Sequence, residues 1–268
     1  MGLQYVKVFG ERNTGTNLLE DVLRRQTDLQ VLSHVGTVQE ARRQMQVLLQ
    51  SPNPTPLHVE TRRRLYRYVI EDHLLSTQFC EHFGWKHGAV QRCQLETASN
   101  FARTLFVCIT RDPYKFIASL YRRPYQLEPD PAVHASLLDF INAPILLFPK
   151  DNLPARPILD SPVQLWNLKT RSYALLARQL PRQAITLSYE ELIASPVQTL
   201  APLGEFCALS ANPVLAELST KGDDKTLEQY RREAIDWRPR YQLGDAVVDA
   251  INCFLDAEVM AMTGYSCC

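Results

Sequence analysis

The residues best suited to chemistry lie in one short loop near the start of the chain, residues 10–17, Gly-Glu-Arg-Asn-Thr-Gly-Thr-Asn. Its two glycines have four residues between them, a spacing that lets the backbone curl so that several N–H groups point at one anion. A helix starting directly behind the loop would add a partial positive charge. Thr14 and Thr16 add hydroxyl donors, and Arg12 adds a fixed charge. The pattern predicts a phosphate-binding loop, with an ordinary strand–turn–helix connection as the alternative.

The loop departs from the motif that binds nucleoside triphosphates. The two glycines are correctly spaced, but Thr16 and Asn17 stand where that motif needs lysine and a serine or threonine. The phosphate lysine and the magnesium hydroxyl are therefore both missing. A small-molecule kinase with a degenerate loop stays an alternative, and it would bind ATP with magnesium.

A second candidate anion site follows the apolar run 105–109. Arg111 comes directly after this run, and Ser119 lies eight residues later at the flank of the following helix. A guanidinium binds phosphate oxygens with two parallel hydrogen bonds. Ligands of open α/β sheets bind at the carboxyl ends of the strands, where Arg111 would lie. The alternative is that Arg111 pairs with Asp112 or with another surface carboxylate.

Strand and helix patterns alternate along the chain, which predicts an α/β fold. The run 105–109 has no polar alternation, as is typical of a strand buried on both faces of a parallel sheet. Asp112 and Pro113 are good residues to cap and begin a helix. We expect three layers, with a central, mainly parallel sheet flanked by helices. The expected strands are 5–9, 83–86, 105–109 and 184–188, and further expected helices are about 16–25, 163–180 and 245–262.

Length and composition suit residues 1–268 as one domain, with a helical insertion at about 38–80 and a helical C-terminal part at about 196–268. The 29 basic and 29 acidic side chains cancel, so no nucleic-acid partner is expected and any anion site must be local. No apolar run is long enough for a membrane span. Seven scattered cysteines and no signal peptide favour a cytoplasmic location.

These motifs together resemble the cytosolic-type sulfotransferase family and its bacterial relatives, over roughly residues 5–225. In that family a loop of the type Lys-Ser-Gly-Thr-Thr holds the 5′-phosphosulfate, and residues 13–17 occupy the matching positions. An arginine and a serine eight residues apart hold the 3′-phosphate, as Arg111 and Ser119 would here. The resemblance implies a P-loop-like fold and 3′-phosphoadenosine 5′-phosphosulfate (PAPS) as co-substrate, without a metal. The family's loop lysine is Asn13 in this chain, and we expect Arg12 to supply its charge.

Three further segments extend the resemblance. Residues 85–88, Trp-Lys-His-Gly, are similar to a Lys-x-His segment, and residues 186–192 to a segment whose tyrosine lies near the adenine. Lys221, followed by a glycine, is a weaker match to a basic segment that closes on the 3′-phosphate. The resemblance thus implies these donor-binding residues: Arg12, Asn13, Thr14, Gly15, Thr16, Asn17, Arg111, Ser119, Tyr189 and Lys221.

Transfer of a sulfuryl group to a hydroxyl needs a base that titrates near neutral pH. His87 is the candidate, with Glu11 and Glu96 as alternatives. Lys86 would stabilise the transferring sulfonate, with a merely solvated side chain as the alternative, and Arg12 would bind the leaving phosphate. The expected acceptor is a hydroxyl or amine of a saccharide or small molecule. A non-catalytic nucleotide-binding module with the same fold is the remaining alternative.

Overall fold

The computed structural model describes residues 2–32, 82–124, 127, 133–153, 157–210 and 226–268. The predicted helical insertion at about 38–80 and Lys221 lie outside these residues.

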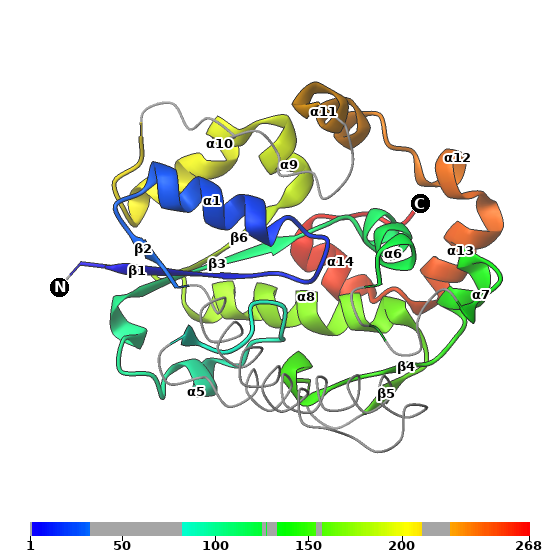
Figure 1. Ribbon diagram of the computed structural model, residues 1–268, viewed down its shortest axis with the longest axis horizontal. Coiled ribbons are helices and arrows are strands. Elements are labelled where there is room, and N and C mark those ends of the chain that lie inside the picture. The colour runs from blue at the N-terminus through cyan, green and yellow to red at the C-terminus, as the bar shows by residue number, and fades with distance from the viewer. Residues whose placement is uncertain (1, 33–81, 125–126, 128–132, 154–156, 211–225) are drawn as a thin grey trace, which may run out of the picture.

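A four-stranded sheet forms the centre of the described chain, and all its neighbouring strands are parallel (Figure 1). The strand order is β2-β1-β3-β6. The prediction of an α/β fold with a central parallel sheet is therefore confirmed. The strands are β1 (Tyr5–Phe9), β2 (Gln30–Val31), β3 (Thr104–Thr110) and β6 (Ala184–Ser188), and a separate antiparallel pair is formed by β4 (Ile145–Leu146) and β5 (Ile158–Leu159).

Helices cover both faces of the sheet, which gives the three expected layers. Helices α1 (Thr16–Gln26), α9 (Tyr189–Ala194) and α10 (Pro196–Leu200) lie on one face, and α8 (Pro162–Gln179) lies on the other (Figure 1). All seven residues of β3 are buried, as its apolar sequence predicts. Alternate side chains of this strand enter opposite layers: Leu105, Val107 and Ile109 pack with α1, and Phe106 and Cys108 pack with α8.

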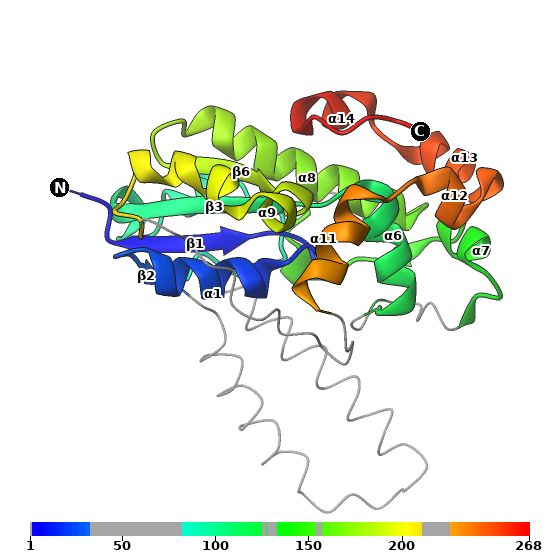
Figure 2. The same ribbon diagram turned by 90° about the horizontal axis from the view of Figure 1, so that it is seen from above.

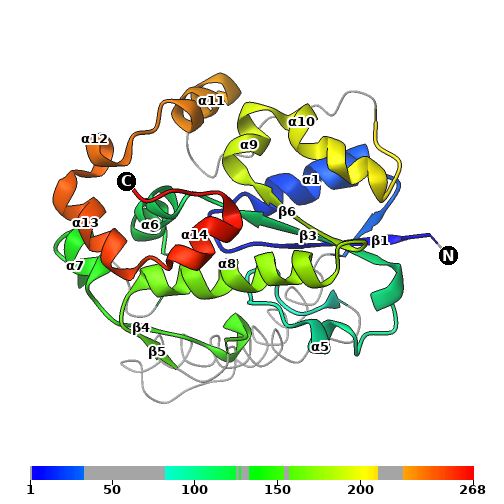
Figure 3. The ribbon, with the colours of Figure 1, turned by 180° about the vertical axis from the view of Figure 1, so that it is seen from behind.

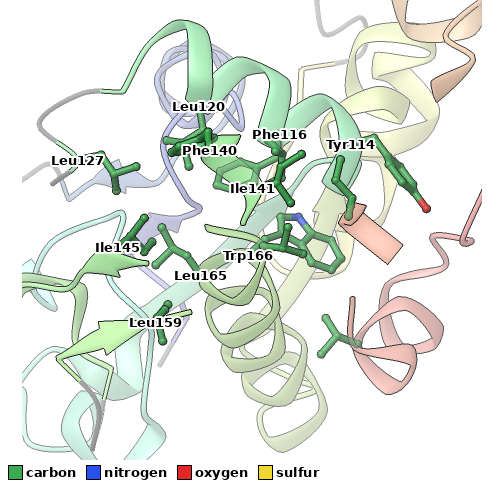
Figure 4. Close-up of a cluster of buried hydrophobic side chains, with 14 of the residues drawn as sticks. Tyr114, Phe116, Leu120, Leu127, Phe140, Ile141, Ile145, Leu159, Leu165 and Trp166 are labelled. Atoms are coloured by element: carbon green, nitrogen blue, oxygen red, sulfur yellow. The ribbon is translucent and has the colours of Figure 1, made fainter. Parts of the chain in front are cut away.

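A third hydrophobic cluster fixes the C-terminal part of the chain beside the sheet. In it, α6 (Pro113–Arg122) and α7 (Leu137–Ile141) pack against α8, and Figure 4 shows Phe116, Phe140 and Trp166 pointing into the same cluster. Figure 3 shows α14 (Ala257–Thr263) lying along α8, and these two helices are in contact.

The carboxyl ends of the strands point toward α6 and the C-terminal helices, as Figure 2 shows. A loop that follows β1 and a loop that follows β3 therefore open on the same side of the molecule. The remaining elements are α5 (Arg92–Leu95), η2 (Phe101–Arg103), η4 (Pro149–Asp151), η5 (Ala201–Glu205), α11 (Leu227–Ile235), α12 (Pro239–Leu243) and α13 (Asp245–Phe254).

Two predicted elements were wrong. Residues 83–86 are not a strand, because Phe83 (φ 57°) and Gly84 (φ 73°) adopt left-handed conformations that no strand accepts. The single helix predicted near 245–262 is two helices. The Asp256 side chain accepts hydrogen bonds from the N–H groups of Glu258 and Val259, so it caps a new helix at that point.

Candidate functional site

The loop of residues 10–17 lies between the carboxyl end of β1 and the start of α1. Asn13 (φ 64°) and Gly15 (φ 88°) both adopt left-handed conformations, which curl the loop over the first turn of α1. Gly15 is required for a second reason, because a Cβ there would lie 2.5 Å from Cδ2 of Tyr189. The Tyr189 ring thus packs directly on the loop, at the residue that caps the N-terminus of α1.

Hydrogen bonds within the loop hold this curl. The Thr14 hydroxyl donates to the Glu11 carbonyl at 2.5 Å, and the Thr14 N–H donates to the same oxygen at 3.2 Å. Oε1 of Glu11 accepts from the Arg12 N–H at 2.6 Å. The Thr14 hydroxyl, predicted as a donor to an anion, is therefore engaged inside the loop in this structure.

Arg111 joins the second predicted site to the first. Its Nη1 donates to the Asn13 carbonyl at 2.6 Å, and its guanidinium lies 4.8 Å from the centre of the Tyr189 ring. The carboxylate it approaches is Glu190, with 4.0 Å between Nε and Oε1, rather than Asp112. The Arg111 Nε is buried, and it has no hydrogen-bond partner among the residues that the structure describes. The two predicted anion sites thus form one continuous region.

Ser119 lies in α6, the helix that begins two residues after Arg111. Asp112 caps this helix by accepting from the Lys115 N–H at 2.9 Å, and Pro113 is its first residue, as predicted. Ser119 is half-buried. At the far end of the helix, the Arg123 carbonyl accepts a 3.4 Å hydrogen bond from Nδ2 of Asn13. The loop therefore contacts both the start and the end of α6.

Two further groups that could bind an anion lie near Arg111, and neither was predicted from the sequence. The ammonium of Lys115 lies 3.8 Å from Oε1 of Glu190 and 5.7 Å from the centre of the Trp237 ring. Burial lowers the pKa of Lys115, against the opposing effect of Glu190. The Trp237 Nε1–H is buried and unpartnered within the described part of the chain. The spacing of four residues from Arg111 to Lys115 could have indicated the lysine, whereas Trp237 is too distant in sequence to be found from spacing.

His87 lies at the opposite end of the loop. Its Nδ1 is 2.7 Å from the Gly10 carbonyl oxygen. Because a carbonyl can only accept, Nδ1 carries the proton of the neutral ring, and Nε2 is the basic nitrogen. The ring is half-buried and meets the face of Trp85 edge-on, with 5.1 Å between centres. The backbone of Lys86 also holds residues 85–88 against the loop, since the Gly10 N–H donates to the Lys86 carbonyl at 2.9 Å.

The Lys86 side chain lies under α1. Its ammonium is buried and donates to Oδ1 of Asn17 at 2.6 Å and to Oε2 of Glu20 at 2.9 Å. The prediction from the sequence was that this charge stabilises a transferring sulfonate. In the structure it links residues 85–88 to the first turns of α1, and it occupies the Asn17 oxygen.

Arg12 stacks on Trp85, with 4.6 Å from its guanidinium carbon to the ring centre. Nearby, the buried Lys169 pairs with Glu11 and with Asp151, the latter at 2.7 Å. Burial acts to raise the pKa of Asp151, but Lys169 and Arg12 outweigh it, and the pKa lies below its usual value. Arg12 is therefore held in an organised, buried group of charges on the His87 side of the loop.

No protein-family model matches the sequence, and no curated protein matches it either. Among solved structures, a sulfotransferase domain from the curacin biosynthetic pathway is similar, with 14% sequence identity, coverage of 98% of each chain and a TM-score of 0.51. The fold is that of a sulfotransferase domain. A sulfotransferase domain from the Synechococcus PCC 7002 olefin synthase also matches, with 14% identity, coverage of 96% of this chain and 97% of that chain, and a TM-score of 0.41.

Among the described candidate residues, Arg111, His87 and Tyr189 contact the loop of residues 10–17. Glu96, by contrast, is exposed and pairs with Arg92 at 2.6 Å. The described residues hold no group of three or more histidine, cysteine, aspartate or glutamate side chains placed to bind a metal ion. None of the described helices is long and apolar enough to cross a membrane.

Proposed function

We propose that this chain transfers a sulfuryl group from PAPS to a hydroxyl or amine of a saccharide or small molecule. The observation that carries the proposal is the hydrogen bond from Arg111 to the Asn13 carbonyl, because it joins the two candidate anion-binding elements. PAPS has phosphates at both the 5′ and 3′ positions, whereas ATP has no 3′-phosphate. The similar fold of a solved sulfotransferase domain supports the same choice.

The residues present fit such a donor. The buried N–H groups of Arg111 and Trp237 lack partners among the described residues, and buried donors of this kind are usually completed by another group, such as a bound ligand or ordered water. We assign the 3′-phosphate to Arg111, Ser119 and Lys115. We assign the 5′-phosphate to the N–H groups at residues 13–17 and the helix end behind them. Tyr189, which packs between the loop and Arg111, would contact the adenine side of the donor.

His87 is the proposed general base. PAPS supplies the sulfuryl group: the acceptor oxygen or nitrogen bonds to sulfur as the bond from sulfur to the bridging phosphate oxygen breaks, which leaves 3′-phosphoadenosine 5′-phosphate (PAP). Nε2 of His87 takes the proton of the acceptor, and the Gly10 carbonyl holds the ring in the tautomer that allows this. Arg12 stabilises the negative charge that develops on the leaving phosphate.

The two glutamates are poorer bases in this geometry. Glu11 is paired with the buried Lys169 and accepts the Arg12 N–H, so its carboxylate is occupied on both oxygens. Glu96 is exposed and paired with Arg92. Both carboxylates are thus already engaged in ion pairs within the protein.

Incubation of the protein with PAPS labelled at sulfur, against a panel of saccharides, phenols, alcohols and amines, tests the proposal. We expect a labelled product with at least one acceptor class, formed equally in the presence of a metal chelator. Absence of transfer to every class, with PAP still bound tightly, would instead identify a non-catalytic module of this fold. Magnesium-dependent transfer from ATP would identify a kinase.

A further inference from the structure

A carboxylate lies beside both cations of the proposed 3′-phosphate site. Oε1 of Glu190 is 3.8 Å from the Lys115 ammonium and 4.0 Å from Nε of Arg111. This oxygen is buried and has no hydrogen-bond partner among the residues that the structure describes. A phosphate bound here would meet the negative charge of Glu190 as well as the two cations, so this side chain either weakens the site or helps to build it.

The other oxygen of Glu190 is held by three donors. Oε2 accepts hydrogen bonds from the Tyr265 hydroxyl at 3.1 Å, from the Asp112 N–H at 3.3 Å and from the Ser188 hydroxyl at 3.4 Å. Because these contacts fix Oε2, the orientation of the whole carboxylate is fixed, with Oε1 near the two cations. Glu190 is therefore a charge held in place by the protein.

Tyr265 reaches Glu190 from a distant part of the sequence. It follows α14, and its ring lies against that of Trp166, with 6.0 Å between the ring centres. Its oxygen also lies 3.3 Å from the hydroxyl oxygen of Thr110, the last residue of β3. Burial, together with the charge of Glu190, raises the pKa of Tyr265 well above its usual value, so the hydroxyl keeps its proton and can donate.

Glu190 can hold two like charges near each other. Arg111 and Lys115 would repel each other if no negative charge lay close to both. Burial lowers the pKa of Lys115, and the positive charge of Arg111 acts in the same direction. The negative charges of Glu190, Asp112 and Glu233 act to raise it. The carboxylate thus favours the charged form of Lys115 in the absence of a ligand.

We propose that Glu190, held by Tyr265, is a positioning residue that keeps Arg111 and Lys115 together for the 3′-phosphate. This inference rests on the proposed function. The Nε–H of Arg111 is buried and has no hydrogen-bond partner within the described part of the chain, so it can donate to a phosphate oxygen while Glu190 stays in place. Removal of this negative charge should therefore weaken the binding of an anion.

Calorimetric titration with PAP and with adenosine 5′-monophosphate (AMP), which differs from PAP only in lacking the 3′-phosphate, tests the proposal. E190Q keeps the size of the side chain and an oxygen that can accept from Tyr265, but it removes the charge. We expect E190Q to weaken PAP binding by roughly tenfold and AMP binding by less than about twofold. A carboxylate that only repels the phosphate would instead give tighter PAP binding in E190Q.

The variant Y265F tests the support from the distant tyrosine. It keeps the ring against Trp166 and removes only the hydroxyl, which guards against a folding defect in E190Q. We expect Y265F to weaken PAP binding by about threefold, with AMP binding unchanged, and to add little to the loss in the double variant with E190Q. Additive losses in the double variant would show that Tyr265 does not act through Glu190.

A pH series separates this role from a purely structural one. Between pH 7 and pH 9.5 the 3′-phosphate stays ionised, so a change in PAP affinity reports on the protein. We expect the affinity to fall with rising pH, and the fall to begin at a lower pH in E190Q, because Lys115 then loses its proton more easily. In a K115M background, E190Q should no longer shift the profile.

The matched control is Glu191, the next residue of α9, whose side chain is exposed. E191Q removes one negative charge from the same helical turn and should bind both ligands as the wild type does. Tighter or unchanged PAP binding in E190Q, equal losses of PAP and AMP, or identical pH profiles would overturn the inference while leaving the donor itself established. A wild-type protein that binds neither ligand would overturn the proposed function as well.

Discussion

At the scale of single residues, the proposed chemistry depends on which nitrogen of His87 is basic. The 2.7 Å contact from Nδ1 to the Gly10 carbonyl fixes the tautomer, so only Nε2 can accept a proton. Gly10 itself has no room for a side chain, since a Cβ would lie 2.7 Å from the Ile109 carbonyl. The carbonyl group that positions the base therefore belongs to a residue with no space for a side chain.

Two amide variants separate the position of His87 from its basicity. Asn can imitate the Nδ1 donor and Gln can imitate Nε2, but neither side chain can take a proton at neutral pH. We expect both H87N and H87Q to lower kcat by about 10²–10⁴-fold, with PAP affinity within about twofold of the wild type. Steady-state kinetics with the acceptor found by screening, together with calorimetry, give both values. A kcat close to that of the wild type in both variants would remove His87 as the base.

The buried side chain of Lys7 should make the free energy of unfolding depend on pH. It is buried in β1, where its ammonium donates to the Gly84 carbonyl at 2.9 Å. Burial is the main cause that lowers the pKa of Lys7 from 10.5 to about 7. The negative charge of Glu20 acts to raise this pKa, and the positive charge of Lys86 acts to lower it further. Between these two values the unfolded chain binds more protons than the folded one, so the free energy of unfolding should rise with pH, by at most about 1.4 kcal/mol per unit.

The variant K7M isolates this contribution. Urea unfolding of the wild type and of K7M should be measured from pH 6.5 to pH 9.5. We expect the free energy of unfolding of the wild type to rise more steeply with pH than that of K7M. Parallel curves for the two proteins would show that Lys7 does not titrate in this range.

At the scale of elements, the sequence correctly predicted the strands whose residue pattern matches their buried position in the sheet. The strands 5–9 and 184–188 begin and end where predicted, because apolar runs bounded by polar turns suit buried parallel strands. The segment 83–86 has two left-handed residues, and it forms hydrogen bonds with Lys7 and Gly10 in place of strand pairing. Tertiary contacts of that kind are invisible in one sequence.

The loop between β1 and α1 makes Gly15 a sensitive position. G15A would force an alanine into a left-handed conformation and push its Cβ to 2.5 Å from the Tyr189 ring. We expect a loss of about 1–3 kcal/mol in the free energy of unfolding and weaker PAP binding. In the matched variant G204A the new Cβ makes only an ordinary 3.7 Å contact, so little change is expected in chemical denaturation. Equal stabilities of G15A and G204A would contradict the packing described for Tyr189.

Helix α8 is tied to the loop through Lys169, whose ammonium pairs with Glu11 and Asp151 in the interior. K169M would leave both carboxylates buried without this cation, and we expect a loss of about 3–5 kcal/mol in the free energy of unfolding. The exposed pair of Arg92 and Glu96 offers the control, because R92M should cost less than about 1 kcal/mol. Thermal and urea unfolding compare the two, and a K169M loss no larger than that of R92M would argue against a supporting role.

At the scale of the whole molecule, the sequence predicted the two parts of the site that are continuous in the chain. Residues 10–17 and Arg111 were found because each follows a recognisable strand, and the parallel sheet then brings them to one edge. Lys115 and Trp237 were missed as contributors. Their placement near Arg111 depends on α6 and on the segment after α11, which meet through tertiary contacts.

The central claim is that this chain binds a nucleotide carrying both 5′ and 3′ phosphates. Calorimetric titration with PAP, in buffer containing a metal chelator, tests it most directly, with R111A as the matched variant and ATP as the competing ligand. We predict one PAP site per chain, binding of ATP that is weaker by at least roughly tenfold, and loss of that preference in R111A. Equal affinity for PAP and ATP, or binding that appears only with magnesium, would contradict the account.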